Sequence, residues 1–255
     1  MTIPTLRADG KVVVITGGSK GLGRAMALGF ARAGADVVVA SRKLEACEQV
    51  AVEIRSLGRK ALALSCHVGD WAQCEALVAA TVEEFGRIDV LVNNAGIAPV
   101  PPSLKEVTSE LFDKTIDVNL KGPLRLSALA AEHMPAGGAI INISSKASTH
   151  PSPFTVVYAV AKAGLNTLTA AAAQEFAPRG IRVNGIICGT FDTDSLRRAI
   201  TSDEAWQSAA SRVSVGRIAH ADEIVGTALY LASDASSYMT GKMVVLDGGG
   251  SLAKP

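Results

Sequence analysis

Short β-branched runs alternate with longer helical stretches along the whole chain, and this alternation constrains the fold more than any other feature. The runs predict seven strands, at residues 11–16, 36–40, 61–68, 89–93, 139–144, 182–187 and 243–246. Strands that are apolar throughout and separated by helices are typical of a parallel sheet covered on both faces. The pattern therefore predicts an α/β fold with a doubly wound, seven-stranded parallel sheet.

Helices are predicted between these strands at 22–33, 44–57, 71–85, 109–133 and 155–176. Asp70 is a suitable N-cap for the third helix, whereas Gly34 and Gly58 end the first two. Pro123 predicts a bend or a break in the fourth helical region.

No linker rich in Pro, Gly or Ser divides the chain, so the 255 residues are expected to form one domain, 1–255. One segment, at about 189–219, breaks the rhythm of strand and helix. It is too long for a connector, and it is therefore predicted to be a lid or a small helical insertion.

Composition excludes several other classes of protein. Hydrophobic residues make up 48% of the chain and charged residues 19%, which excludes a disordered chain. Lys and Arg total 25 against 24 for Asp and Glu, without a basic stripe, so neither nucleic acid nor an anionic membrane is expected as a partner. No stretch approaches about 18 consecutive apolar residues, so no membrane span is expected.

The four cysteines are Cys47, Cys66, Cys74 and Cys188, and none belongs to a CxxC pair. They indicate free, reduced thiols rather than a disulfide framework, and we assign no metal site. Residues 1–10 have no apolar core and are not typical of a signal peptide. These features predict a cytoplasmic protein.

A glycine-rich turn joins the first predicted strand to the first helix. In residues 16–23 (TGGSKGLG), Gly17, Gly21 and Gly23 form the pattern GxxxGxG. Without Cβ atoms, such a turn lets a pyrophosphate approach the backbone and sit at the helix N-terminus. An ordinary glycine turn is the alternative. A P-loop is excluded, because neither Gly-Lys dipeptide precedes Ser or Thr.

Three polar residues in the second half of the chain are candidates for a reactive site. Tyr158 and Lys162 are four residues apart in a predicted helix, which places the phenol and the ammonium on one face. A cation lowers a phenol pKa that starts near ~10, so Tyr158 could exchange a proton near neutral pH. Ser145 follows a buried strand, where ligands of open α/β sheets bind. Each residue alone also fits a structural role.

These residues occur together and in order, and the chain thereby resembles the short-chain dehydrogenase/reductase family. The resemblance extends from about Gly10 to Gly249. It rests on the glycine-rich turn, NNAG at 93–96, Asn119, Ser145, YAVAK at 158–162, Thr240-Gly241 and DGG at 247–249. It implies a Rossmann fold and an NAD(P)-dependent interconversion of a carbonyl compound and an alcohol.

The resemblance places the family's catalytic tetrad on Asn119, Ser145, Tyr158 and Lys162. It implies that Tyr158 protonates the carbonyl oxygen and that Ser145 hydrogen-bonds that oxygen. Lys162 would bind the nicotinamide ribose and lower the pKa of Tyr158, and Asn119 would hold a proton-relaying water. Besides Tyr158 and Lys162, the residues implied to contact the cofactor are Gly17, Ser19, Lys20, Gly21, Leu22, Gly23, Ser41, Arg42, Lys43, His67, Val68, Asn94, Ala95, Gly96, Gly189, Thr190 and Thr193.

Two positions depart from the family pattern. Cys188 stands where proline usually precedes Gly189, so we expect a more mobile loop there, with a thiol that is a modification site or an ordinary loop thiol. His67 stands where the family generally has an Asp that contacts the adenine amino group. A neutral His67 could accept that hydrogen bond, or its ring could stack on the adenine.

The end of the second predicted strand indicates which cofactor is preferred. Enzymes that use NAD usually place an acid there to bind the ribose hydroxyls. This chain has Ser41, Arg42 and Lys43 instead, with Lys20 in the glycine turn. Three cations favour the 2′-phosphate of NADP over NAD, although Arg42 and Lys43 could also simply solvate a helix start.

The leading interpretation is an NADP-dependent ketone reductase or secondary-alcohol dehydrogenase that acts on a small molecule. One alternative is a 3-oxoacyl-(acyl carrier protein) reductase, because Arg179 matches a basic position of such enzymes. A non-catalytic dinucleotide sensor and a structural oligomer are others, and the intact tetrad counts against both. The resemblance also implies a homotetramer. The substrate would lie against residues 145–158 and under residues 189–219.

Overall fold

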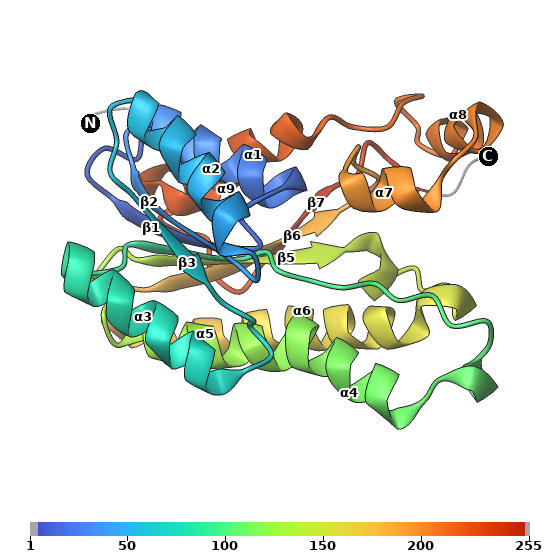
Figure 1. The fold of residues 1–255 in the computed structure, drawn as a ribbon, viewed down its shortest axis with the longest axis horizontal. Helices are drawn as coiled ribbons and strands as arrows, with labels where there is room; N and C mark the ends of the chain where they lie inside the picture. Colours follow the sequence, from blue (N-terminus) through green and yellow to red (C-terminus); the bar gives the residue numbers. More distant parts are fainter. Residues whose placement is uncertain (1–4, 253–255) are drawn as a thin grey trace.

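The computed structural model describes residues 5–252, so the first four residues of the segment judged unlike a signal peptide lie outside it. Seven parallel strands form one sheet in the order β3-β2-β1-β4-β5-β6-β7, which confirms the predicted architecture (Figure 1). The strands are β1 Val12–Thr16, β2 Asp36–Ser41, β3 Ala61–Ser65, β4 Val90–Asn93, β5 Ala139–Ser145, β6 Arg182–Cys188 and β7 Met243–Leu246. The winding direction reverses between β1 and β4, where open α/β sheets bind ligands.

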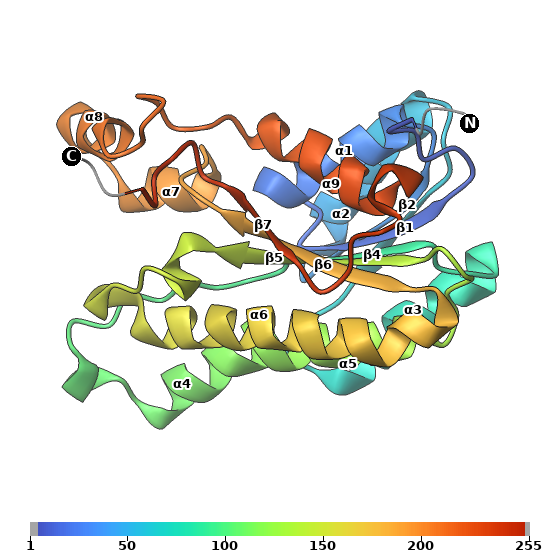
Figure 2. The ribbon, with the colours of Figure 1, turned by 180° about the vertical axis from the view of Figure 1, so that it is seen from behind.

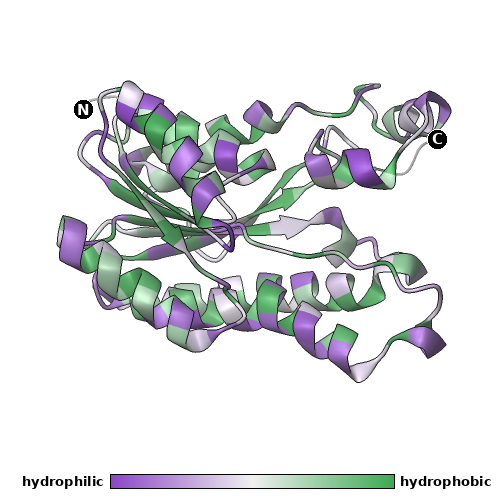
Figure 3. Cartoon of the chain, viewed as in Figure 1, coloured by the Kyte–Doolittle hydropathy of each residue, from purple (hydrophilic) through white to green (hydrophobic). Residues whose placement is uncertain are grey.

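Helices cover both faces of the sheet, as Figures 1 and 2 show from opposite sides. One face carries α1 Gly21–Arg32, α2 Leu44–Ser56 and α9 Val225–Ala232. The other carries α3 Trp71–Phe85, α5 Gly122–Ala131 and α6 Val156–Phe176, with α4 Ser109–Ile116 packed against α6. Figure 3 shows the apolar strands between these layers. A separate hydrophobic core fills each side of the sheet.

The segment predicted as a lid or insertion contains two short helices, α7 Asp194–Ala199 and α8 Asp203–Ser211. Figure 1 shows both beyond the ends of β5 and β6. The two ends of the segment are joined at its base, because Asp192 N donates to Ala219 O at 2.8 Å and Ala219 N donates to Thr190 O at 3.1 Å. The excursion of α7 and α8 therefore starts and returns at one point beside β6.

Several boundaries differ from the sequence predictions, those of β3, β5 and β6 among them. β3 ends at Ser65 rather than at residue 68, because the chain turns there toward α3. β5 and β6 each extend one residue further, since Ser145 pairs with Cys188 in the parallel ladder. Of the bend or break predicted at Pro123, the break is absent: a π-helical turn, Asp117–Lys121, leads directly into α5, and proline in the first turn of that helix needs no N–H partner.

A chain of buried side-chain hydrogen bonds fixes α6 on the sheet. Asn93 Nδ2 donates to Ser127 Oγ at 3.1 Å and to Asn142 Oδ1 at 2.9 Å, which links β4, α5 and β5. Asn142 Nδ2 then donates to Thr169 Oγ1 of α6 at 2.9 Å. Because buried polar groups are costly when unpaired, this chain specifies how α6 is seated. The position of Tyr158 and Lys162 follows from that seating.

The longest helical stretch, Pro153–Arg179, is also long and apolar enough to pass for a membrane span by composition. In this fold it packs against β5, β6 and α4. Its buried residues, which include Val157, Leu165 and Phe176, therefore pack beneath the sheet. The remaining short 3₁₀ turns are Leu104–Glu106, Lys146–Ser148, Pro153–Thr155, Ala177–Arg179, Ala221–Ile224 and Asp234–Ser236.

Candidate active site

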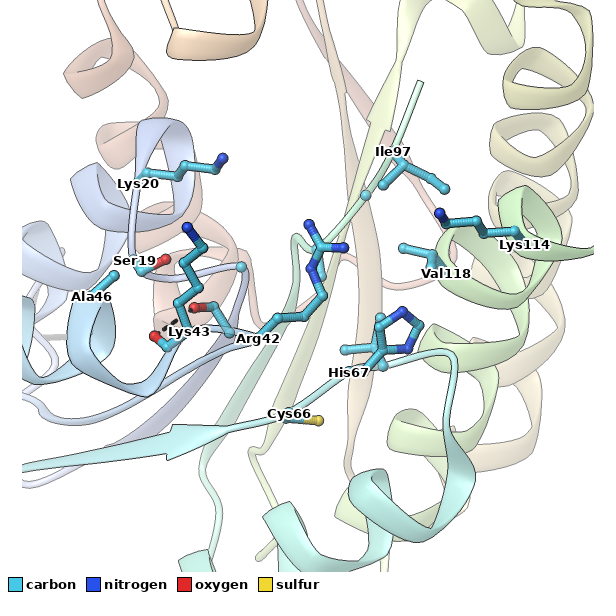
Figure 4. A pocket seen from close by; sticks show the side chains of 15 residues that line it. Ser19, Lys20, Arg42, Lys43, Ala46, Cys66, His67, Ile97, Lys114 and Val118 are labelled. Atoms are coloured by element: carbon cyan, nitrogen blue, oxygen red, sulfur yellow. Dashed lines mark hydrogen bonds between the residues drawn. The ribbon is translucent and has the colours of Figure 1, made fainter. Parts of the chain in front are cut away.

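A cavity of about 600 Å³ opens where β1, β2 and β4 end, and Figure 4 shows its walls. Ten residues predicted to contact a cofactor line it: Gly17, Ser19, Lys20, Ser41, Arg42, Lys43, His67, Val68, Ala95 and Gly96. Five further lining residues were missed by the sequence analysis: Ala46, Cys66, Ile97, Lys114 and Val118. The cavity lies at the reversal of the strand order, as expected for a dinucleotide site.

Two glycines of the turn have no room for a side chain. Gly17 has φ +63°, and a Cβ on it would fall 2.8 Å from Asn94 Nδ2. A Cβ on Gly23 would fall 2.2 Å from Gly17 O. Asn94 Nδ2 donates to Thr16 O at 2.8 Å and to Gly17 O at 3.2 Å, which locks the turn against β4. The turn can therefore pack tightly against the residues that follow β4, and Gly17, Ser19 and Lys20 line the cavity at the N-terminus of α1, where a pyrophosphate would bind.

Nine other predicted cofactor residues do not line this cavity: Gly21, Leu22, Gly23, Asn94, Tyr158, Lys162, Gly189, Thr190 and Thr193. Gly23 and Asn94 support the turn, while Leu22 packs against the hydrophobic core. A Cβ on Gly21 would lie 3.4 Å from Thr193 Cγ2, so the N-cap of α7 lies beside the glycine turn. Their contact with a cofactor stays a prediction.

The cavity walls are positively charged. Figure 4 shows Arg42, Lys43 and Lys20 on one side and Lys114, from α4, on the other. None of the described residues that line the cavity is acidic. Lys114 was missed because only the tertiary packing of α4 brings it to this wall. These groups provide a site for a polyanionic ligand.

His67 lies at the wall nearest to α3 (Figure 4). Its backbone N donates to Gln73 Oε1 at 2.8 Å, and Gln73 Nε2 donates to Asp70 Oδ2 at 2.9 Å. Asp70 caps α3 as predicted, through its contacts with the backbone N atoms of Ala72 and Gln73. The stretch that carries His67 is therefore anchored by the first turn of α3.

The predicted tetrad converges from β5, α6 and the π-helical turn. Ser145 is the last residue of β5, and its Oγ accepts from Ala147 N at 3.2 Å. Tyr158 and Lys162 lie one turn apart in α6, with Lys162 Nζ 5.8 Å from the centre of the tyrosine ring, so their predicted common face is confirmed. Lys162 is 3% exposed, and its Nζ donates to Ile143 O at 2.7 Å.

Asn119 joins this group through Gly96. Its Nδ2 donates to Ile97 O at 2.8 Å and to Thr115 O at 2.9 Å, while its Oδ1 accepts from Ile97 N at 3.3 Å. A Cβ on Gly96 would fall 2.8 Å from Asn119 Oδ1 and 3.8 Å from Lys162 Nζ. Gly96 also lines the cationic cavity, so it connects that cavity to the tetrad.

The expectation that Lys162 lowers the pKa of Tyr158 is wrong for this structure. Burial raises the pKa of Tyr158 to about 12, and its hydrogen bond with Ser145 offsets only part of that effect. Burial also lowers the pKa of Lys162 to about 8. The ammonium lies over the ring and donates to a backbone carbonyl, so desolvation dominates both groups.

Cys188 is not a residue of a mobile loop, contrary to expectation. It ends β6, pairs with Ser145 on one side and Leu246 on the other, and is 6% exposed. Burial raises the pKa of its thiol to about 12. The ladder hydrogen bonds therefore restrict this position even without proline.

Comparisons with known proteins agree with this geometry. Residues 17–251 match a family model described as enoyl-(acyl carrier protein) reductase. The chain is 38% identical to L-rhamnose 1-dehydrogenase (NAD(P)(+)) of Azotobacter vinelandii, covering 94% of this chain and 96% of that protein. It is 36% identical to the 3-oxoacyl-[acyl-carrier-protein] reductase of Thermotoga maritima, covering 96% and 99%. A short chain dehydrogenase from Burkholderia cenocepacia in complex with NADP superposes with a TM-score of 0.90 at 32% identity, covering 96% and 99%.

The buried position of Lys162 predicts a pH-dependent stability. Its pKa falls from 10.5 to about 8 on folding, so between these values the unfolded chain holds a proton that the folded chain has lost. Stability therefore rises with pH across this window. Relative to Lys162→Met, the free energy of unfolding of the wild type should rise by on the order of 2 kcal/mol between about pH 8 and pH 10.

Urea unfolding at several pH values measures this difference. The exposed Lys105→Met variant is the matched control, and it should keep the profile of the wild type. Parallel profiles for the wild type and Lys162→Met would contradict the assigned pKa shift.

Proposed function

The chain belongs to the short-chain dehydrogenase/reductase family, and from this premise we propose that it transfers a hydride between NADP(H) and a ketone or secondary alcohol. The convergence of Ser145, Tyr158 and Lys162 beside Gly96, at the edge of a cationic cavity, carries this proposal. The glycine turn fits the group, since Gly17, Ser19 and Lys20 line the cavity at the N-terminus of α1, where a pyrophosphate would sit. The NADP in the Burkholderia cenocepacia protein supports the same reading.

Tyr158 acts as the acid in carbonyl reduction. A bound nicotinamide cofactor supplies the hydride. Because the pKa of Tyr158 is raised to about 12, the phenol keeps its proton at neutral pH and can donate it to the carbonyl oxygen. Ser145 hydrogen-bonds Tyr158 and stabilises the same oxygen by a second hydrogen bond.

Lys162 and Asn119 have supporting roles beside Tyr158. With its pKa near 8, Lys162 is charged below that pH and offers a cation to a ribose hydroxyl. Asn119 fixes Ile97 through both backbone groups of that residue and thereby orients the stretch that follows Gly96. The proton-relaying water at Asn119 remains part of this proposal.

Tyr158→Phe should remove the proton donor and leave the fold intact, because the ring keeps its packing. General acid–base catalysis contributes ~10²–10⁴-fold, so kcat for ketone reduction should fall by that order. NADPH consumption over a ketone panel measures it. Tyr238→Phe changes a fully exposed tyrosine and should have no effect. Wild-type turnover by Tyr158→Phe on a substrate that the wild type reduces would contradict the assigned role.

The preference for NADP rests on the charges around Ser41. A 2′-phosphate brings roughly two negative charges and three acceptor oxygens to this wall. Arg42 can engage it through a planar fork, and Lys20 and Lys43 add point charges. Each charge-assisted hydrogen bond contributes about 1.5–3 kcal/mol, less where exposed, so a roughly 10–100-fold preference for NADPH over NADH follows.

Ser41→Asp should reverse this preference, because a carboxylate repels the phosphate and accepts hydrogen bonds from a bare ribose. The ratio of kcat/KM for NADPH and NADH in paired titrations is the measurement. Ser56→Asp adds the same charge on the exposed end of α2 and should leave the ratio unchanged. Equal or better kcat/KM with NADH in the wild type would show that Arg42, Lys43 and Lys20 do not bind a 2′-phosphate.

The structure adds little support for the alternative of a 3-oxoacyl-(acyl carrier protein) reductase. Arg179 donates to Glu132 Oε1 at 3.0 Å and to the carbonyl of Ala131, so this basic group is already engaged within the chain. The dehydrogenase and reductase relatives described above are almost equally similar, so they do not favour either substrate. We therefore keep the proposal that the substrate is a small molecule. We also propose that the protein acts in the cytoplasm.

A homotetramer is the assembly that we propose with this function. Phe112, Leu124 and Val160 leave apolar side chains exposed on α4, α5 and α6, and Val245 is exposed on the edge strand β7. Surfaces of this kind commonly mark interfaces of symmetric oligomers. Light scattering should give about four times the 26.3 kDa of the chain, and a 26.3 kDa particle at micromolar concentration would refute this assembly.

A further inference from the structure

Two thiols lie together behind the cavity wall that carries His67. Cys66 immediately follows β3 and lines the cavity, and Cys74 lies in the first turn of α3. Their side chains are hydrogen-bonded to each other. Each also contacts the backbone on the other's side of the turn, with Cys66 Sγ 3.6 Å from Gln73 O and Cys74 Sγ 3.3 Å from Val68 O.

The other two cysteines have different surroundings. Cys47 Sγ lies 3.0 Å from Ser41 Oγ, and Cys188 ends β6 beside Lys162. All four thiols are free and buried. Neither Cys66 nor Cys74 has a role in the proposed reaction, yet Cys66 borders the cavity that a small solute can enter. Figure 4 shows the Cys66 sulfur below His67 at that wall.

We propose that Cys66 and Cys74 form a reversible disulfide when a peroxide enters the cofactor cavity, and that a bound dinucleotide prevents it. The effect on cofactor affinity rests on the proposed function, whereas the disulfide itself does not. Disulfides in proteins that otherwise keep reduced thiols are commonly of this transient, sensing kind.

The chemistry needs one peroxide for each disulfide. The Cys74 thiol releases its proton, the thiolate attacks one peroxide oxygen and the O–O bond breaks, which gives a sulfenic acid and a hydroxide; the hydroxide takes up the released proton and becomes water. The neighbouring thiol then attacks the sulfenic sulfur, the S–S bond forms, and a second water leaves with the last thiol proton. Two thiols are oxidised and one H₂O₂ is reduced to two waters. A dithiol reductant reverses the step by thiol–disulfide exchange.

The local electrostatics favour a single thiolate. The hydrogen bond between the thiols raises the pKa of Cys66, and burial adds to that effect. The same hydrogen bond lowers the pKa of Cys74, although burial and the charges of Asp70 and Glu75 oppose the shift, and Arg125 contributes a further small lowering. One sulfur of such a pair can therefore ionise while the other keeps the proton needed for the second step.

A disulfide would change the wall that contacts a cofactor. The stretch between the two cysteines includes His67 and Val68, which line the cavity. His67 is held by its hydrogen bond to Gln73, the residue next to Cys74. Linking the sulfurs replaces their contacts with Val68 O and Gln73 O and shifts this stretch. We expect NADP⁺ to bind at least about tenfold more weakly, which is about 1.4 kcal/mol.

Mass spectrometry after peroxide treatment tests the proposal directly. Trypsin releases both cysteines in one peptide, residues 61–87, because no Lys or Arg lies between Lys60 and Arg87. In the oxidised wild type this peptide should be lighter by two hydrogen atoms and resist alkylation until a dithiol is added. Saturating NADP⁺ during treatment should slow the change. A peptide that keeps two alkylatable thiols after peroxide overturns the proposal.

Cys74→Ser and Cys74→Ala remove one partner and are compared with Cys188→Ala as the matched control. The control should form the disulfide, and the two Cys74 variants should not. NADP⁺ affinity, measured by calorimetry before and after peroxide, should fall in the wild type, recover with dithiothreitol, and stay constant in whichever Cys74 variant folds. A disulfide that leaves NADP⁺ affinity unchanged, or forms equally fast with NADP⁺ bound, overturns the regulatory part. Failure of untreated wild type to bind NADP⁺ or reduce ketones instead contradicts the proposed function.

Discussion

The close approach of three backbone segments at the end of β1 is the constraint on which the rest of the site depends. A Cβ on Gly23 would fall 2.2 Å from Gly17 O, and Asn94 fills the remaining space with hydrogen bonds to Thr16 and Gly17. Only glycine permits this contact, which lets α1 begin directly behind the turn while β4 lies alongside. The glycine turn and Gly96 both line the cavity, and Gly96 lies next to Asn119 and Lys162 of the tetrad.

Burial then decides the chemistry at the other end of the site. Tyr158 and Lys162 share a helix face, and a surface pair of this kind would simply attract each other. Beneath the sheet, desolvation moves their pKa values toward the neutral forms, to about 12 and about 8. A protonated phenol suits the donation of a proton to a carbonyl. The stability lost by burying Lys162 is thus consistent with a functional requirement rather than with folding.

The walls of the cofactor cavity carry two kinds of group, cationic side chains and thiols, which come from different parts of the fold. Arg42 and Lys43 lie where β2 runs into α2, while Lys114 comes from α4 on the opposite wall. Cys66 and Cys74 meet because β3 stops early and the chain turns back onto the first turn of α3. The same turn carries His67, so cofactor binding and thiol chemistry share one short stretch of backbone.

The sequence by itself determined the class of fold, because apolar strands and periodic helices are local patterns, and it determined the glycine turn and the Tyr158–Lys162 spacing for the same reason. Helix α9, the uninterrupted helical path through Pro123, the early end of β3 and the pairing of Cys188 with Ser145 were decided by tertiary packing. The structure also decided the position of Lys114 at the cavity, the pairing of the Cys66 and Cys74 thiols, and the direction of the Tyr158 pKa shift. Most of these depend on which distant segments pack together and on how much water they exclude, and the thiol pair depends on the turn between β3 and α3, so none of them can be read from a periodic pattern in the sequence.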